Sequence, residues 1–193
     1  MRQAEPNWFI ALTVDPGEWY GPFLRTIPRH IRAFNAQDLH ITVAFLRTCG
    51  EVKARAAFEA VEPHFTRPLR IELAGVEALG NRWRPSALGI VGHGGATEVA
   101  EFTDEIRDLA AWKAGVEPET RPPKPHVTVI RPPKRGSLQE IREILDWAAG
   151  VAPLGVEIEL GRLALYTRSD ERGRQFRNVA EKVFHSKAAP TEP

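Results

Sequence analysis

The sequence has little of several features that define common protein classes. It contains a single cysteine, Cys49, so no disulfide can form within one chain, and a reducing, cytoplasmic setting is expected. No apolar run approaches the ~20 residues needed to cross a bilayer, and no signal peptide is apparent at the N-terminus. No spacing of histidine, cysteine and acidic residues resembles a zinc site. We therefore expect no membrane partner, no metal and no other cofactor.

Excess charge of one sign is also absent. The 26 basic and 25 acidic residues give a formal net charge of +1, which excludes a general polyanion-binding field. The basic residues comprise 20 arginines and 6 lysines. Arginine can hold phosphate oxygens with two parallel hydrogen bonds, so the composition permits phosphate binding without requiring it. The 193 residues fit one domain or two small lobes.

A short pattern occurs twice in the chain, as His40-Ile41-Thr42-Val43 and as His126-Val127-Thr128-Val129. Each copy lies in a segment with the composition of a buried strand. Successive side chains of a strand point to opposite faces, so the histidine and threonine of each copy share one face. Two such strands facing each other across a cleft would present two imidazoles and two hydroxyls to one pocket.

This set of groups suits acid–base chemistry on a phosphodiester. In-line displacement at phosphorus needs a base on the attacking water and an acid on the departing oxygen, and a neutral and a protonated histidine supply both near neutral pH. Thr42 and Thr128 would donate hydrogen bonds to the non-bridging oxygens. A strained cyclic phosphate is the natural substrate for so small a site. Taken singly, each threonine is equally consistent with ordinary β-propensity.

The apolar periodicity and the turn residues predict alternating strands and helices. Strands are expected at 8–14, 39–46, 69–79, 87–91, 126–130, 156–166 and 174–184. Helices are expected at 18–31, 51–64, 97–113 and 137–149, the last with a capping box from Ser137 and Glu140. The order of strands and helices suggests an internal duplication. The short, hairpin-like connections between strands favour antiparallel sheets in an α+β fold. We expect one domain over 1–185 and a loose tail over 186–193.

The paired tetrads resemble the signature of the 2H phosphoesterase superfamily, and within it the RNA 2′,3′-cyclic phosphodiesterases, also called 2′-5′ RNA ligases. The likeness runs over most of residues 7–184. It is carried by five segments of the chain, at 8–12, 38–46, 84–91, 124–131 and 165–168. The chain departs from the family at Arg47, where a glycine is frequent, and this could alter substrate preference.

The resemblance implies a bilobal α+β fold, with two mainly antiparallel sheets and outer helices facing each other across a pseudo-twofold cleft. It also implies metal-independent opening of 2′,3′-cyclic phosphate ends to 2′-phosphates. His126 would be the base that activates water and His40 the acid for the 3′ oxygen, although the near symmetry leaves the reverse assignment open. The partners would be RNA ends or small cyclic nucleotides, bound by a monomer.

Three further residues are candidate ligands. Arg131 follows the second tetrad and would bind phosphate or ribose, provided that the strand twists or ends at Ile130; the alternative is a solvated loop arginine. Phe45 could stack on a base. Core packing is the competing interpretation, because strict alternation puts Phe45 on the face of Ile41. Arg168 could contact the RNA backbone, or lie in a solvated hairpin.

Two other functions remain open at this stage. ATP-independent joining of 2′-5′ linked RNA ends is the same chemistry run backwards. A non-catalytic module that binds nucleotides or RNA ends would use the same cleft without turnover. Both histidines argue against such a module, since binding alone needs no acid–base pair.

Overall fold

A computed structural model describes residues 5–81, 83–133 and 135–184. Within these residues the strands are β1 (Trp8–Thr13), β2 (His40–Arg47), β3 (Leu69–Asn81), β4 (Arg84–Gly92), β5 (His126–Ile130), β6 (Val156–Leu160), β7 (Arg162–Arg168) and β8 (Phe176–Val183). The helices are α1 (Tyr20–Thr26), α2 (Glu51–Val61), α3 (Ala96–Ala114) and α4 (Leu138–Gly150). Two 3-10 turns, η1 (Ala36–Asp38) and η2 (Glu62–His64), complete the set. None of the helices in the described ranges is long and apolar enough to span a bilayer.

The strands form one sheet in the order β6-β3-β4-β5-β2-β1-β7-β8, with antiparallel neighbours throughout. The α+β class expected from the sequence is confirmed. The two expected sheets are instead two four-stranded halves of a continuous sheet, because β2 and β5 pair where the halves meet. That junction has a single registered pair, Ile41 with Val127. Counted outward from this junction, β5, β4, β3 and β6 of one half correspond to β2, β1, β7 and β8 of the other, which gives the fold its pseudo-twofold organisation.

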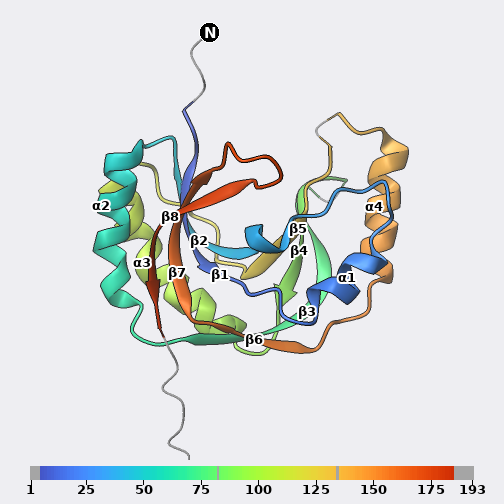
Figure 1. The fold of residues 1–193 in the computed structure, drawn as a ribbon, viewed down its shortest axis with the longest axis horizontal. Coiled ribbons are helices and arrows are strands. Elements are labelled where there is room, and N and C mark those ends of the chain that lie inside the picture. Colours follow the sequence, from blue (N-terminus) through green and yellow to red (C-terminus); the bar gives the residue numbers. More distant parts are fainter. Residues whose placement is uncertain (1–4, 82, 134, 185–193) are drawn as a thin grey trace, which may run out of the picture.

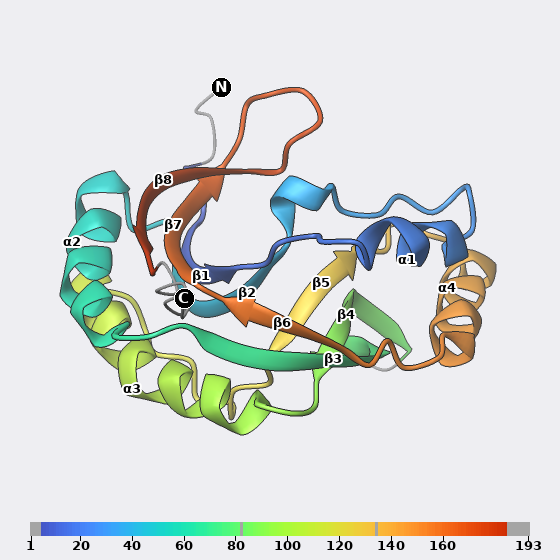
Figure 2. The same cartoon turned by 60° about the horizontal axis from the view of Figure 1, so that its bottom comes forward.

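The helices lie at the two ends of the molecule (Figures 1 and 2). Helices α2 and α3 pack together at one end, and α3 also contacts β2. Helices α1 and α4 lie at the other end, where the rings of Phe23 and Trp147 meet at 6.0 Å. The main hydrophobic core continues through both halves of the sheet.

The expected strand at 156–166 is two strands, and the break at Gly161 has a topological reason. Strand β6 pairs with β3 at one edge of the sheet, whereas β7 pairs with β1 in the other half. The chain therefore changes halves at Gly161. Helix α1 is shorter than expected because Ile27, which precedes Pro28, adopts an extended conformation (φ −75°, ψ 130°) and ends it.

Helix α4 begins as the sequence predicts. The Ser137 side chain accepts a hydrogen bond from the Glu140 backbone N–H (3.2 Å), and the Glu140 carboxylate accepts one from the Ser137 backbone N–H (2.7 Å). This capping box satisfies donors that the first turn leaves unpaired. The helix is thereby fixed just after the loop that follows β5.

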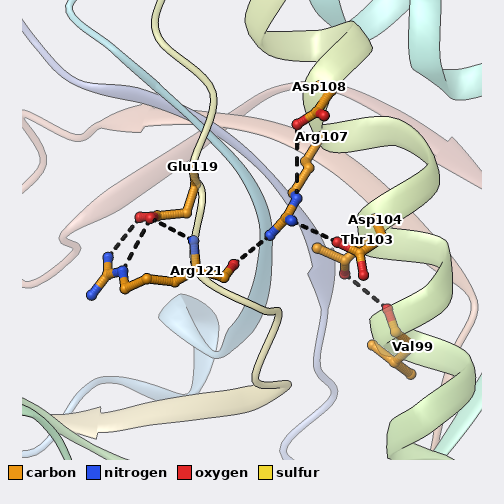
Figure 3. A network of polar contacts seen from close by, with 7 residues as sticks. All are labelled: Val99, Thr103, Asp104, Arg107, Asp108, Glu119 and Arg121. Atoms are coloured by element: carbon orange, nitrogen blue, oxygen red, sulfur yellow. Dashed lines mark hydrogen bonds and ion pairs between the residues drawn. The ribbon is translucent and has the colours of Figure 1, made fainter.

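A polar network fastens the segment that leads into β5 (Figure 3). Arg107 on α3 donates a hydrogen bond to the backbone carbonyl of Arg121 (2.7 Å) and pairs with Asp104 on its own helix (2.7 Å). Glu119 accepts two hydrogen bonds from the Arg121 side chain, and these lower the pKa of Glu119 to about 2. The proline-rich approach to the second tetrad is thus held against α3.

The expected tail, 186–193, lies outside the described residues, so its looseness and the domain boundary at 185 stay predictions.

Candidate active site

The pairing of β2 with β5 brings the two tetrads together. Ile41 and Val127 are registered partners and are buried, with exposed fractions of 1% and 0%. Antiparallel pairing places Thr128 beside His40 and His126 beside Thr42, one position to either side. All four side chains then lie on the face opposite the buried pair. Each imidazole has the hydroxyl of the other tetrad as its cross-strand neighbour.

Both histidine rings are oriented by the same local hydrogen bond. Nδ1 of His40 lies 2.7 Å from the carbonyl oxygen of Asp38, and Nδ1 of His126 lies 2.6 Å from that of Lys124. A carbonyl can only accept, so Nδ1 carries the proton in each ring. Nε2 is then the atom that exchanges a proton with a substrate. The two copies are equivalent in conformation as well as in sequence.

The surroundings of the two rings differ. His40 is 7% exposed and is enclosed by Phe9, Tyr166 and Phe176, whose ring centroids lie 4.9, 5.8 and 5.3 Å from its own. Burial lowers the pKa of His40 to about 4, opposed by its hydrogen bond to Asp38 and assisted by the charges of Arg131 and His126. His40 is therefore neutral at pH 7 in the free protein.

His126 is half-buried and lies against a glycine. Burial also lowers the pKa of His126, with the hydrogen bond to Lys124 acting in the opposite direction. Gly89 on β4 is the registered partner of Thr128. A Cβ atom at Gly89 would lie 3.0 Å from Cδ2 of His126 and 3.3 Å from its Cβ. The absence of a side chain at Gly89 is what allows the ring to take this position.

A cavity of about 760 Å³ opens beside His40. Thr42, Phe45, Arg131 and Arg168 line it together with His40, so five of the residues expected from the sequence meet here. His126 and Thr128 do not line this cavity, although the charge of His126 acts on His40.

Phe45 lines the cavity because β2 contains a bulge. Ile10 pairs with Ala44 and Ala11 with Thr42, so one residue of β2 is skipped between them. The extra residue places Phe45 on the face of His40 and leaves it 53% exposed. The core-packing interpretation, based on strict alternation, is wrong for this residue.

Arg131 reaches the cavity because β5 ends at Ile130, as the sequence analysis required. Its guanidinium carbon lies 5.7 Å from the ring centroid of Phe34 and 6.0 Å from that of Phe176. Cation–π contacts at these distances hold the side chain over the aromatic wall. Arg168 lies at the end of β7, on the rim.

Sequence reasoning missed several residues of the site. Asp38 is buried beside His40, and Arg32, Arg174 and Phe176 line the cavity. Arg174 lies in the same β7–β8 connection as Arg168, but nothing local in the sequence ties that connection to His40. Its place depends on pairing between segments far apart in the chain.

In the described part of the chain, no three side chains of the His, Cys, Asp or Glu types gather as a metal site would need.

Comparison with known proteins gives matches in both sequence and fold. The chain is 28% identical to an RNA 2′,3′-cyclic phosphodiesterase of Aeropyrum pernix over 127 residues, which are 66% of this chain and 72% of that protein. A crystal structure of a phosphoesterase has a TM-score of 0.72 at 18% identity and covers 95% of this chain and 100% of its own. No family model matches the chain.

A second solved structure, Escherichia coli LigT complexed with 3′-AMP, has a TM-score of 0.68 at 19% identity and covers 94% of this chain and 100% of its own. These structures show the fold, and the curated relative agrees with the resemblance carried by the two tetrads. The chain is thus similar in sequence to an RNA 2′,3′-cyclic phosphodiesterase and has the fold of the LigT-like phosphoesterases.

Proposed function

We propose that this chain is a metal-independent RNA 2′,3′-cyclic phosphodiesterase that leaves a 2′-phosphomonoester. The observation that carries the proposal is the Ile41–Val127 register, which sets two imidazoles and two hydroxyls on one face. The similarity to a curated enzyme of that name supports the substrate class. ATP-independent 2′-5′ RNA ligation belongs to the same proposal, because it is the same ring-opening step with an RNA hydroxyl in place of water as the attacking group.

The proposed reaction is a single in-line displacement. A water oxygen attacks phosphorus while one neutral imidazole takes the proton of the water at Nε2. The bond from phosphorus to the 3′ oxygen breaks, and the other imidazole, protonated at Nε2, gives its proton to that oxygen. The products are a 2′-phosphate and a free 3′ hydroxyl. Between them the two rings lose and gain one proton, so the pair returns to its starting total.

We propose His126 as the base and His40 as the acid. Burial keeps the pKa of His40 at about 4 in the free protein, so this assignment requires His40 to bind a proton as the substrate binds. An anionic phosphate beside the ring favours its charged form and supplies the reason for that uptake. If His40 is instead the base, its neutral free state is already the reactive form.

The remaining site residues bind the substrate. Thr42 and Thr128 donate hydrogen bonds to the non-bridging oxygens, where charge grows in the transition state. Arg131 binds the phosphate from the aromatic wall. The exposed ring of Phe45 stacks on the terminal base, which is worth ~1–3 kcal/mol in proteins that bind single strands. Arg168 contacts the RNA backbone at the rim.

The test uses an RNA oligonucleotide ending in a 2′,3′-cyclic phosphate, in metal-free buffer with EDTA. Conversion to a 2′-phosphate by the wild type is expected, with a loss of at least ~10²-fold in His40→Ala and in His126→Ala. His93→Ala is the matched control, because His93 is an exposed turn residue. The same three variants are assayed for 2′-5′ joining, in which parallel losses are expected.

Other results would contradict the proposal. A 3′-phosphate product would overturn the assigned leaving oxygen, and activity abolished by EDTA would overturn metal independence. Binding of the RNA without turnover by the wild type would leave only a nucleotide- or RNA-end-binding module.

A further inference from the structure

Asp38 makes contacts to two parts of the site at once. Its exposed fraction is 1%, and it ends η1 two residues before His40. The backbone carbonyl of Asp38 accepts the Nδ1–H of His40 at 2.7 Å. Its carboxylate accepts the backbone N–H groups of Gln175 and Phe176, at 3.1 to 3.2 Å. A residue that the reaction does not use thus links a proposed catalytic ring to the start of β8.

The segment that Asp38 holds carries one wall of the cavity. Residues 168–176, here termed the arginine loop, connect β7 to β8, and five of them line the cavity: Arg168, Ser169, Arg174, Gln175 and Phe176. This connection extends well beyond the sheet (Figures 1 and 2). Backbone pairing holds its base, where the Ser169 N–H donates to the Gln175 carbonyl at 3.0 Å. The Asp38 carboxylate links the loop to the segment that leads into β2.

The hydrogen bonds from the two backbone N–H groups to the Asp38 carboxylate are strong because the carboxylate is buried and charged. Hydrogen bonds to an ionised acceptor are about twice as strong as those between neutral groups. Among the described residues, the Asp38 carboxylate has these two backbone N–H donors and takes part in no ion pair. Phe176, one of the donors, also presses its ring edge-on against His40 at 5.3 Å. Release of the carboxylate would therefore disturb the ring as well as the loop.

The second tetrad has a counterpart of this arrangement. Lys124 occupies the same place two residues before His126, and its carbonyl accepts the Nδ1–H of that ring. Its ammonium group bonds to Glu77 of β3 at 2.5 Å. In both halves, the residue that orients the histidine by its carbonyl also attaches through its side chain to a segment that does not pair with the motif strand. Only Asp38 is buried, and only Asp38 reaches a loop of the cavity.

We propose that Asp38 is a positioning residue that couples the arginine loop to His40, so that substrate affinity depends on a carboxylate that never contacts the substrate. The proposal rests on the proposed function for the identity of the ligand. In the intact site, Asp38 holds Arg168 and Arg174 where an anionic RNA end can meet them.

The test compares Asp38→Ala and Asp38→Asn in the full chain, with Asp170→Asn as a matched control because Asp170 is exposed in the same loop. Amide hydrogen exchange reports the Gln175 and Phe176 N–H groups directly. Calorimetry with an RNA oligonucleotide that ends in a 2′-phosphate gives Kd, and the cyclic-phosphate assay gives KM and kcat.

In Asp38→Ala we expect exchange of those two amides to accelerate, and Kd and KM to rise, each by at least ~10-fold. Asp38→Asn keeps an amide oxygen at the place of Oδ1, which accepts both N–H groups, so its Kd lies between wild type and Asp38→Ala. Asp170→Asn matches the wild type.

A folded Asp38→Ala with wild-type exchange at both amides, or with wild-type Kd and KM, would overturn the proposal. If Asp38→Ala does not fold, the test rests on Asp38→Asn. A Kd equal to that of the wild type would then overturn the coupling, and a higher Kd would support it. Failure of the proposed function is separable, because it would appear as absent turnover in the wild type while exchange and Kd still respond to Asp38.

Discussion

At the scale of single residues, the two histidines have the same local conformation and different environments. Each donates Nδ1–H to the carbonyl two residues earlier, yet His40 is enclosed by three aromatic rings while His126 lies over Gly89. Burial lowers both pKa values, and lowers that of His40 to about 4. The pair is matched in geometry and unequal in proton affinity.

This inequality predicts the pH dependence of the reaction. One ring must be protonated and the other neutral, and kcat/KM reports the pKa values of the free enzyme. Whichever ring is the base, the fraction of enzyme with one protonated ring rises as pH passes the pKa of His40, about 4, and falls as pH passes the pKa of His126, which lies below 6.5. A kcat/KM profile measured on the cyclic-phosphate RNA should peak below pH 6.5. A rate still rising at pH 8 would contradict it.

Gly89 is expected to matter through the ring that it accommodates. In Gly89→Ala the new methyl group would lie 3.0 Å from Cδ2 of His126 and from Cδ1 of Leu79, so these side chains must shift by a few tenths of an ångström, and we expect kcat to fall by ~10-fold. Gly75→Ala on β3 is the control, since a Cβ there meets nothing within 4 Å. Wild-type kcat in Gly89→Ala would show that the ring tolerates the methyl group.

At the scale of elements, β2 departs from regular pairing twice. The first irregularity brings Phe45 into the cavity, and the second lies between the pairs Phe9–Phe45 and Trp8–Arg47. There Arg47 adopts a φ of 54°, in the region that favours glycine. This is the position at which the sequence departs from the glycine frequent in the RNA 2′,3′-cyclic phosphodiesterases that it resembles. Arg47 therefore holds a strained conformation at the end of the motif strand.

Relief of that strain should stabilise the protein. The left-handed conformation costs a residue with a Cβ atom roughly 1–2 kcal/mol, so Arg47→Gly is expected to unfold in urea with a free energy about 1 kcal/mol above that of Arg47→Ala. Arg47→Ala is the matched comparison because it removes the same side chain and keeps the Cβ. If Arg47→Gly proves less stable than Arg47→Ala, the conformation is not a source of strain.

At the scale of the whole molecule, burial of His40 makes stability depend on pH. The folded protein holds His40 at a pKa of about 4 against 6.5 for an unperturbed ring, so the unfolded chain binds more protons between these values. The stability that this burial permits is fully present above pH 6.5 and is lost as pH falls toward 4. At 1.36 kcal/mol per pKa unit the loss is about 3 kcal/mol.

Urea unfolding between pH 4 and 7 checks this expectation. His40→Gln should flatten the pH dependence of the unfolding free energy, because the substituted side chain does not titrate. His93→Gln, at an exposed turn, should keep the wild-type dependence. An equal slope in wild type and His40→Gln would assign the pH dependence to other groups.

Much of the fold could be predicted because its signals are local. The period of two in the tetrads, the helical period of α3 and the capping box of α4 each depend on neighbouring residues, and each is present in the structure. The boundaries at Ile27 and Gly161 depend on a following proline and on a change of partner strand. The sequence pattern located the elements but missed the break at Gly161, where the chain passes from one half of the sheet to the other.

The parts of the site that could not be predicted depend on contacts between distant segments. The bulge that exposes Phe45 is visible only in the register of β2 against β1. The hydrogen bonds from Gln175 and Phe176 to Asp38 span 137 and 138 residues. No local pattern carries such a pairing, because it follows from the order of strands in the sheet.

The sequence by itself determined which groups do the proposed chemistry, since the alternation of a strand sets His40 with Thr42 and His126 with Thr128 whatever surrounds them. The tertiary structure alone decided that the two pairs lie side by side on one face of the sheet, that one ring is buried among aromatic side chains, and that Asp38 joins the arginine loop to His40. Side-chain direction is a property of neighbouring residues. Burial, proton affinity and the shape of a cavity are properties of what the whole chain brings to one place.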